Sequence, residues 1–306
     1  MKVGIIGAGS VGTGMGLLLK ERGYTLVGVS SRTYSSAEKA AARLNCPAWK
    51  EPEEVARRAE VVFVTTSDQA IAAVAHQVAA KGGFRPGQTV IHMSGSLTSE
   101  VLNPARRHGA WALSLHPLQS CADADRAVAN LPGSVFSIEG DREAYPLAER
   151  LVKDLGGEFF YIRPEDKALY HAAACVASNY LVSLVDLSYQ LMAAAGMNPQ
   201  MAAKALAPLI EGTWKNIREK GIPAALTGPI SRGDVSTVGG HLKAMREKTP
   251  HLLDIYSALG RRTVEVARRK GTLGEREAAA FLRLFAATPG RAQPGRAQGR
   301  EAGYSG

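Results

Sequence analysis

Three glycines near the start of the chain have the spacing of a phosphate-binding turn. Gly7, Gly9 and Gly12 follow an apolar segment, 2–6, and Gly12 lies at the start of a segment, 11–22, with a helical pattern. In a strand–turn–helix unit the first glycine permits the tight turn, the second lets a phosphate approach the backbone, and the third lets the helix pack on the strand. The free N–H groups at the helix start then face the phosphate. The sequence therefore predicts a dinucleotide site formed by Gly7, Ala8, Gly9, Ser10, Val11 and Gly12.

The end of the next expected strand, 25–29, indicates which dinucleotide binds. An NAD-binding unit usually carries an acidic residue there, which accepts hydrogen bonds from the ribose 2′-hydroxyl. This chain has Ser31, Arg32 and Thr33 instead. The planar guanidinium of Arg32 suits a 2′-phosphate, and the two hydroxyls can add hydrogen bonds. We therefore expect NADP(H) as the cofactor; if Arg32 is only a solvated loop residue, the two cofactors are not discriminated.

Polar residues also follow the later strands of the expected sheet. In open α/β sheets, ligands bind beyond the carboxyl ends of the strands. His116 leaves a strand just before a proline, which favours contact with the substrate. The residues expected to contact the cofactor after the strands 60–65 and 88–93 are Thr65, Thr66, Ser94 and Gly95.

Two further polar residues near these strand ends can be explained by a structural role rather than by contact with a ligand. Asp68 follows the strand 60–65 and is expected to cap the helix 69–80. His92 lies within a strand end, where a core histidine with satisfied hydrogen bonds is as good an explanation as a functional one.

A polar stripe runs along a mostly apolar helix expected over residues 165–195. Lys167, His171, Cys175 and Asn179 are spaced by four, and Ser178 lies beside them. Because unpaired buried polar groups cost a few kcal/mol each, the stripe needs partners, which a substrate cleft would supply. Reduction of a carbonyl or imine needs a proton donor and groups that hold the substrate. The structural alternatives are a solvated first-turn lysine for Lys167 and helix–helix hydrogen bonding for Asn179.

The loop 227–234 is a second region with candidate substrate contacts. Glycine and proline punctuate it, so its backbone conformation is specified. Arg232 could bind a substrate carboxylate through its guanidinium, or instead pair with Asp234 or contact a second subunit. Ser236 is expected to cap the next helix. The substrate residues predicted here and on that helix are Ser231, Arg232, Thr237 and His241.

The order of the expected elements predicts the fold class. Residues 1–162 alternate strands and helices, as in a doubly wound Rossmann sheet, and residues 163–288 have only helical patterns. We therefore expect an α/β N-terminal domain that binds the dinucleotide, followed by an all-helical substrate and dimerisation domain. Residues 289–306 are Gly, Pro, Arg and Ala without an apolar period, and we expect a disordered tail.

Composition excludes several classes of protein. The 306 residues carry a net charge of +9, but Lys and Arg are scattered without a nucleic-acid motif, so we expect a small anionic partner and no nucleic acid. No apolar run approaches the ~20 residues that span a bilayer, so we expect no membrane segment. Three cysteines without metal spacing predict no metal site and suit a reducing cytoplasm.

Four strings resemble a known family. They are VIHMSGS (90–96), SLHPLQS (114–120), YHAAACVASNYL (170–181) and LTGPISRGD (226–234). With the element order, they make residues 1–286 similar to the 6-phosphogluconate-dehydrogenase-like superfamily, and within it to Rossmann-like proteins with a C-terminal domain of unknown function 2520. Ketopantoate reductases and pyrroline-5-carboxylate reductases are relatives in that superfamily. The resemblance implies an NADP-dependent reductase and a homodimer built on the helical domain.

The resemblance also implies roles on the long helix. Ketopantoate reductases and β-hydroxyacid dehydrogenases place a catalytic Lys followed by Asn there, which makes Lys167 or His171 the acid and Asn179 a substrate-positioning residue. The position four after Lys167 is His171 and not Asn, which leaves the acid open and slightly favours His171. We expect reduction of a 2-oxo acid such as ketopantoate or of a pyrroline-5-carboxylate-type imine. The alternative is a non-catalytic NADP-binding redox sensor that acts through its dimer.

Overall fold

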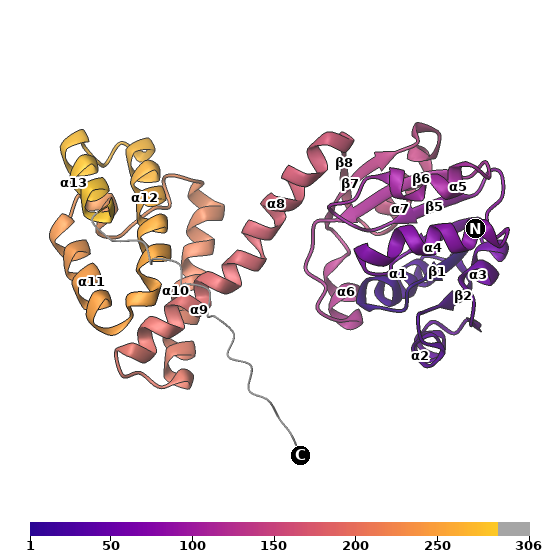
Figure 1. Cartoon of the computed structure of the whole chain (residues 1–306), viewed down its shortest axis with the longest axis horizontal. Helices are drawn as coiled ribbons and strands as arrows, with labels where there is room; N and C mark the ends of the chain where they lie inside the picture. Colours follow the sequence, from indigo (N-terminus) through magenta and orange to yellow (C-terminus); the bar gives the residue numbers. More distant parts are fainter. Residues whose placement is uncertain (287–306) are drawn as a thin grey trace, which may run out of the picture. The chain divides into compact units, whose positions relative to one another are not determined.

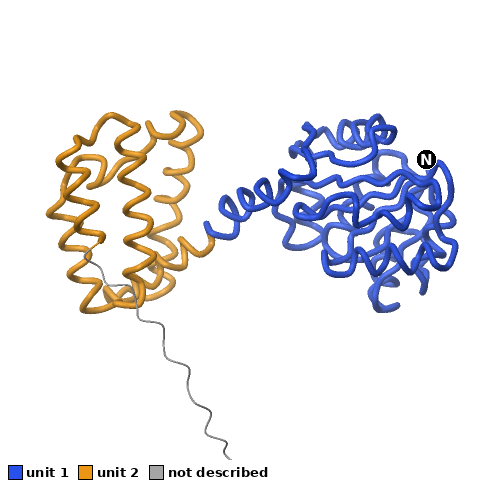
Figure 2. Tube along the Cα trace, turned by 45° about the horizontal axis from the view of Figure 1, so that its top comes forward, with its two compact units in different colours: residues 1–181 blue, residues 182–306 orange. Residues whose placement is uncertain are grey.

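The computed structural model describes residues 1–286, which form two compact units: Met1–Leu181 and a second unit that begins at Val182 (Figure 2, blue and orange). The first unit contains all eight strands, and helix α8 (Lys167–Ala177) belongs to it. We predicted the domain boundary at 162/163, where the strands end. The predicted disordered tail, 289–306, lies outside the described residues.

The first unit is built on one eight-stranded sheet with the order β3-β2-β1-β4-β5-β6-β7-β8 (Figure 1). Strands β1 to β6 are parallel to one another, and β7 and β8, which are parallel to each other, run in the opposite direction because β7 pairs antiparallel with β6. The strands are β1 (Lys2–Ile6), β2 (Thr25–Ser30), β3 (Ala48–Trp49), β4 (Val61–Val64), β5 (Thr89–His92), β6 (Trp111–Pro117), β7 (Val135–Gly140) and β8 (Glu158–Tyr161). This arrangement confirms the predicted doubly wound α/β sheet.

Helices cover both faces of this sheet because its central strands are apolar on both sides. Within β4, Phe63 belongs to one core cluster, and Val62 and Val64 belong to the other. The helices of the first unit are α1 (Ser10–Glu21), α2 (Tyr34–Leu44), α3 (Pro52–Arg58), α4 (Asp68–Ala80), α5 (Asn103–Arg106), α6 (Ala124–Asn130), α7 (Tyr145–Asp154) and α8. Sequence analysis did not predict α5 and α6, which are short.

The second unit is all-helical, as predicted. Its helices are α9 (Asn179–Ala194), which begins in the first unit, α10 (Pro199–Lys220), α11 (Val235–Lys248), α12 (Leu253–Lys270) and α13 (Glu275–Ala286). Their apolar faces enclose one core that includes Val238, Leu242, Val264 and Phe281.

Two expectations about the long apolar helix are wrong. The single helix expected over 165–195 is divided into α8 and α9 at Ser178, whose φ of −114° and ψ of −70° depart from helical values. The segment Pro164–Ala194 also contains an 18-residue window with a mean hydropathy of 1.4, which has the length and apolar composition of a membrane span, whereas we expected no such run. None of its most apolar window is buried within the chain.

Candidate active site

The turn between β1 and α1 uses its three glycines for three different purposes. Gly7 has a φ of +120°, and a Cβ there would lie 2.6 Å from the Thr65 carbonyl carbon. A Cβ on Gly12 would lie 2.1 Å from the Gly7 oxygen, so α1 packs directly on the turn. A Cβ on Gly9 would instead enter open space, with no atom of another described element within 4 Å of it. This is the division of roles that a pyrophosphate-binding turn requires.

A cavity of about 680 Å³ extends from this turn across the carboxyl ends of β1, β2 and β4. It contains two cations: Arg32 at the end of β2, and Lys50, whose ammonium lies 5.5 Å from the centre of the Tyr34 ring. Sequence analysis predicted Arg32 and missed Lys50, which follows the two-residue strand β3. Of the predicted cofactor residues, those that line this cavity are Gly7, Ala8, Gly9, Ser31, Arg32, Thr33, Thr65 and Thr66.

Two unpaired hydroxyls test whether this cavity fits a dinucleotide. Ser30 Oγ and Thr66 Oγ1 line it, are buried, and have no hydrogen-bond partner among residues 1–286. Buried polar groups without partners are rare and call for an explanation. The start of α1 also has no side-chain cap, which leaves N–H groups free for a phosphate. Open space at Gly9, free donors and two cations together fit an anionic dinucleotide.

The turn after β5 lies beside this cavity. Asp68 follows Ser67, which lines the cavity, and its carboxylate accepts hydrogen bonds from Ser94 Oγ at 2.7 Å and Ser96 Oγ at 3.0 Å. The expectation that Asp68 caps the following helix is wrong, because α4 begins at Asp68 itself and has no side-chain cap. Asp68 instead holds the turn that contains Ser94 and Gly95.

His92, at the end of β5, stabilises the same turn through hydrogen bonds that involve both of its ring nitrogens. Its Nδ1 accepts a hydrogen bond from the Ser94 N–H at 3.2 Å, and its Nε2 donates to the Thr98 carbonyl at 3.1 Å. A backbone N–H only donates and a carbonyl only accepts, so these partners define one neutral form of the ring. Burial, followed by the charge of Lys167, lowers the pKa of His92 to about 4.

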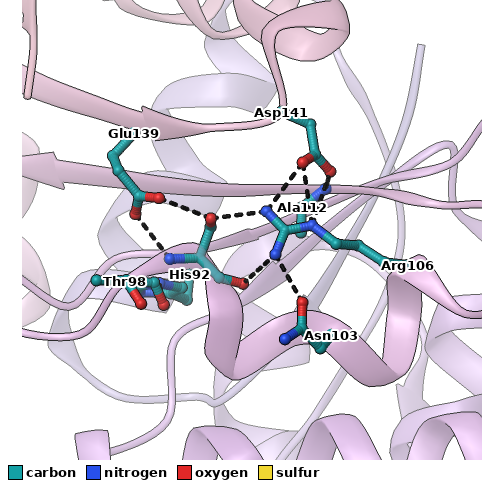
Figure 3. A network of polar contacts seen from close by, with 8 residues as sticks. His92, Thr98, Asn103, Arg106, Ala112, Glu139 and Asp141 are labelled. Atoms are coloured by element: carbon teal, nitrogen blue, oxygen red, sulfur yellow. Dashed lines mark hydrogen bonds and ion pairs between the residues drawn. The ribbon is translucent and has the colours of Figure 1, made fainter. Parts of the chain in front are cut away.

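A polar network holds the C-terminal end of the segment that joins β5 to α5 (Figure 3). Glu139 on β7 accepts hydrogen bonds from the N–H and the hydroxyl of Ser99, at 2.7 and 2.8 Å. Arg106 joins Ser99 to Asp141, and Asp141 accepts a hydrogen bond from the Ala112 N–H. The segment between β5 and α5 is therefore held at both ends, which presents Ser94 and Gly95 in a defined conformation.

A second cavity, of about 580 Å³, lies between the end of β6 and helix α8. Several residues of the predicted polar stripe meet here: His171, Cys175, Ser178 and Asn179, together with His116. The Cys175 sulfur lies 3.9 Å from His171 Nδ1, and the rings of His116 and His171 are 6.3 Å apart. A Cβ on Gly95 would lie 2.8 Å from His116 Nε2 and from His171 Cδ2, so both rings face this glycine.

His116 is neutral at physiological pH. Burial is the largest cause, and the charges of Lys167 and His171 act in the same direction, lowering the pKa of His116 to about 4. Its Nδ1 is 2.8 Å from the hydroxyl of Tyr170, a residue that sequence analysis missed because an aromatic side chain on an apolar helix resembles core packing.

Lys167 lies behind the turn and not in the second cavity. Its side chain is fully buried, and its ammonium donates to Ser114 Oγ at 2.7 Å and toward the Ser94 carbonyl at 3.5 Å. The alternative of a solvated first-turn lysine is therefore wrong. Burial lowers the pKa of Lys167 to about 8, although the carboxylates of Glu139 and Asp68 oppose this effect.

The remaining predicted substrate residues, Ser231, Arg232, Thr237 and His241, lie in the second unit. Ser231 lies 3.2 Å from the Thr272 hydroxyl, Thr237 donates to Asp234, and His241 lies 2.8 Å from the Tyr256 hydroxyl. Arg232 is exposed.

The expected cap at Ser236 is wrong. Asp234 caps α11 by accepting the Thr237 N–H, and Ser236 only donates to Asp234. Hydrogen bonds from Thr237 and Ser236 lower the pKa of Asp234 to about 2.

Comparison with known proteins agrees with this architecture. Residues 1–117 match the model of a Rossmann-like domain, and residues 134–263 match that of a domain of unknown function, DUF2520. The chain is a Rossmann-like protein with a C-terminal DUF2520 domain. No curated protein is significantly similar to it in sequence.

Solved structures with this fold include the candidate NADP oxidoreductase BF3122 from Bacteroides fragilis, with 24% identity and a TM-score of 0.71 over 86% of this chain and 98% of that one. Protein TM1727 from Thermotoga maritima is 26% identical, with a TM-score of 0.68 over 88% and 99% of the two chains. An imine reductase from Pseudomonas sp. is 17% identical, with a TM-score of 0.57 over 93% and 92%. At these identities the similarity establishes a shared fold.

Proposed function

We propose that this protein is an NADP(H)-dependent oxidoreductase that reduces a small anionic carbonyl or imine compound. The observation that carries the proposal is the position of the turn Ser94–Ser96. On one side its hydroxyls bind Asp68, next to the dinucleotide cavity, and on the other side Gly95 faces His116 and His171. The turn thus lies between the cavity proposed for the dinucleotide and the polar second cavity.

The residues of the second cavity divide the chemistry of reduction between them. When bound, the reduced cofactor would supply a hydride to the carbon of the C=O or C=N group. His171 would donate the proton that completes the product, and the neutral ring of His116 would donate a hydrogen bond to the developing negative charge. Ser178 and Asn179, which line the same cavity, would hold the substrate.

Lys167 has a supporting role in this proposal. Its ammonium is buried and donates its hydrogen bonds to Ser114 and Ser94, neither of which lines the second cavity. Its positive charge beneath the turn favours an anionic substrate and disfavours protonation of His116. This arrangement favours His171 over Lys167 as the acid.

The substrate class is supported by the relatives in fold. They include an imine reductase, a reductive aminase from Aspergillus terreus in complex with NADPH, and a pyrroline-5-carboxylate reductase from Coxiella burnetii. A 2-oxo acid such as ketopantoate and a pyrroline-5-carboxylate-type imine both combine the reducible group with a carboxylate.

Oxidation of NADPH by the purified protein, followed with a panel of 2-oxo acids and cyclic imine carboxylates, tests this function. His171→Gln should abolish turnover and leave the affinity for NADPH unchanged. His108→Gln, at an exposed position of the same unit, is the matched control and should retain turnover. Binding of NADPH without turnover on any substrate of the panel would favour the redox-sensor alternative.

The same proposal includes a homodimer in the cytoplasm. Large apolar side chains of α8 and α9 are exposed, among them Leu169, Val176 and Val182 at 77%, 58% and 70%. Several large apolar side chains exposed on one stretch of helix often belong to an interface, and the partner we propose is a second copy of this chain. The three cysteines are free, which suits a reducing compartment.

A further inference from the structure

We propose that Tyr170 is a positioning residue that holds the neutral ring of His116 in the form with its proton on Nε2, so that this N–H faces the substrate. The inference deepens the proposed function, because it rests on His116 as the hydrogen-bond donor of the second cavity. It assigns a role to Tyr170 and to Ser137, which sequence analysis did not consider.

The contact between the two side chains is well defined. The Tyr170 hydroxyl lies 2.8 Å from His116 Nδ1, and the rings meet edge to face with centres 5.5 Å apart. Tyr170 is itself held by an edge contact to the ring of Phe160 on β8, at 5.8 Å. Because Nδ1 is engaged by Tyr170, Nε2 is the nitrogen that remains for the cavity, and it is the one that faces Gly95.

The direction of this hydrogen bond decides which ring nitrogen carries the proton. If Tyr170 donates, Nδ1 is an acceptor and the proton lies on Nε2; if Tyr170 accepts, the proton lies on Nδ1. In the second case a lone pair on Nε2 would face the substrate oxygen or nitrogen and repel it.

In this proposal Ser137 sets the direction. It lies directly opposite His116 in the β6–β7 pair, so both side chains point to the same face of the sheet. Its hydroxyl is buried and has no hydrogen-bond partner among the described residues, so it is free to donate. Burial raises the pKa of Tyr170, and the Ser137 hydroxyl acts in the opposite direction, as an O–H group directed at the phenol oxygen does. Donation by this free hydroxyl to the Tyr170 oxygen would direct the proton of Tyr170 to His116 Nδ1.

A neutral imidazole oriented in this way suits the reaction. It donates a hydrogen bond to negative charge that develops during reduction and does not itself lose a proton, so its low pKa is compatible with the role. The proton that completes the product then comes from His171, as proposed above. Tyr170 and Ser137 act only through His116.

Nitrogen NMR of the full-length protein labelled with ¹⁵N at histidine tests the inference directly. The chain has seven histidines, and the signals of His116 are assigned from a His116→Gln sample. In the unsubstituted protein we expect an unprotonated Nδ1 and a protonated Nε2. A hydrogen bond of ordinary strength favours one form about tenfold, so Tyr170→Phe should lower the ratio of the Nε2–H to the Nδ1–H form by about tenfold. Ser137→Ala should shift it in the same direction.

A second His–Tyr pair in the chain provides the matched control. The Tyr256 hydroxyl lies 2.8 Å from His241 Nδ1, and the rings also meet edge to face. Tyr256→Phe should therefore change the signals of His241 and leave those of His116 unchanged.

A protonated Nδ1 on His116 in the unsubstituted protein would overturn the inference, even if Tyr170→Phe failed to fold. So would identical His116 signals in folded Tyr170→Phe. Absence of reductase activity would contradict the proposed function and leave the NMR result standing, so the two failures are distinguishable.

Discussion

Replacement of Lys167 by methionine is expected to stabilise the protein at neutral pH. The side chain is fully buried and forms no ion pair with a carboxylate of residues 1–286, and its hydrogen-bond acceptors are the Ser114 hydroxyl and the Ser94 carbonyl. Methionine has a similar length, is apolar, and adapts to irregular core space. Ser114 keeps its own hydrogen bond to Ser94 in the variant.

The magnitude follows from the pKa of Lys167, which burial lowers from 10.5 to about 8. This difference corresponds to about 3 kcal/mol against the charged form in the folded protein. Loss of the hydrogen bonds made by Lys167 offsets part of the gain, by about 1–2 kcal/mol. The variant should therefore be more stable by about 1–2 kcal/mol at pH 7.

The same pKa predicts how this difference depends on pH. The penalty for Lys167 is present in full below pH 8, where both the folded and the unfolded chain hold the proton. Between pH 8 and 10.5 the unfolded chain binds the proton more strongly than the folded protein, so stability rises with pH. The advantage of Lys167→Met should fall by about 1 kcal/mol between pH 7 and pH 9.

Urea denaturation at several pH values measures both quantities. In a Trp214→Phe background, the fluorescence of Trp49 and Trp111 reports only the first unit. Lys39→Met, at an exposed position of α2, is the matched control and should change stability little at any pH. A variant that is less stable at pH 7 by more than about 1 kcal/mol, or a difference that does not vary with pH, would refute the reasoning.

Two further predictions concern the glycine turn and the exposed helix. Gly9→Ala should keep the thermal stability and lose dinucleotide binding, because its Cβ enters open space beside the turn. Gly12→Ala should lower the free energy of unfolding by about 1–3 kcal/mol, because its Cβ would lie 2.1 Å from the Gly7 oxygen. Equal melting temperatures for the two variants would contradict this prediction. Light scattering should find that the unsubstituted protein is a dimer and that Val176→Glu is a monomer. An unsubstituted protein that is monomeric, or soluble only with detergent, would exclude a second copy as the partner of the exposed apolar side chains of α8 and α9.

The sequence predicted the fold and the dinucleotide turn well because both depend on local signals. The apolar strands, the helix between them and the spacing of Gly7, Gly9 and Gly12 are all contained in the first thirty residues. The alternation of strands and helices predicted the doubly wound sheet, although not the antiparallel direction of β7, which depends on pairing with a distant strand.

The second cavity could be predicted only in part, because its residues interact across the sheet. His116 and His171 were chosen for their type and position, but the pairing of Tyr170 with His116 joins residues 54 positions apart in the chain. Asp68 was predicted to cap a helix because it directly precedes a helical pattern in the sequence. Its hydrogen-bond partners in the structure, Ser94 and Ser96, instead follow a different strand. The burial of Lys167 likewise depends on β5 and β6 and has no signal in the helix itself.

Fluorescence titration with NADPH and NADH tests the central claim most directly. We expect NADPH to bind more tightly than NADH. Arg32→Ala should weaken NADPH about 10–100-fold through the loss of a charged hydrogen bond and leave NADH unchanged. Arg107→Ala, which removes an exposed arginine elsewhere in the unit, is the control for net charge. Equal affinities would remove the assignment of the 2′-phosphate to Arg32, and absence of binding by either nucleotide would contradict the dinucleotide site and the reductase proposed on it.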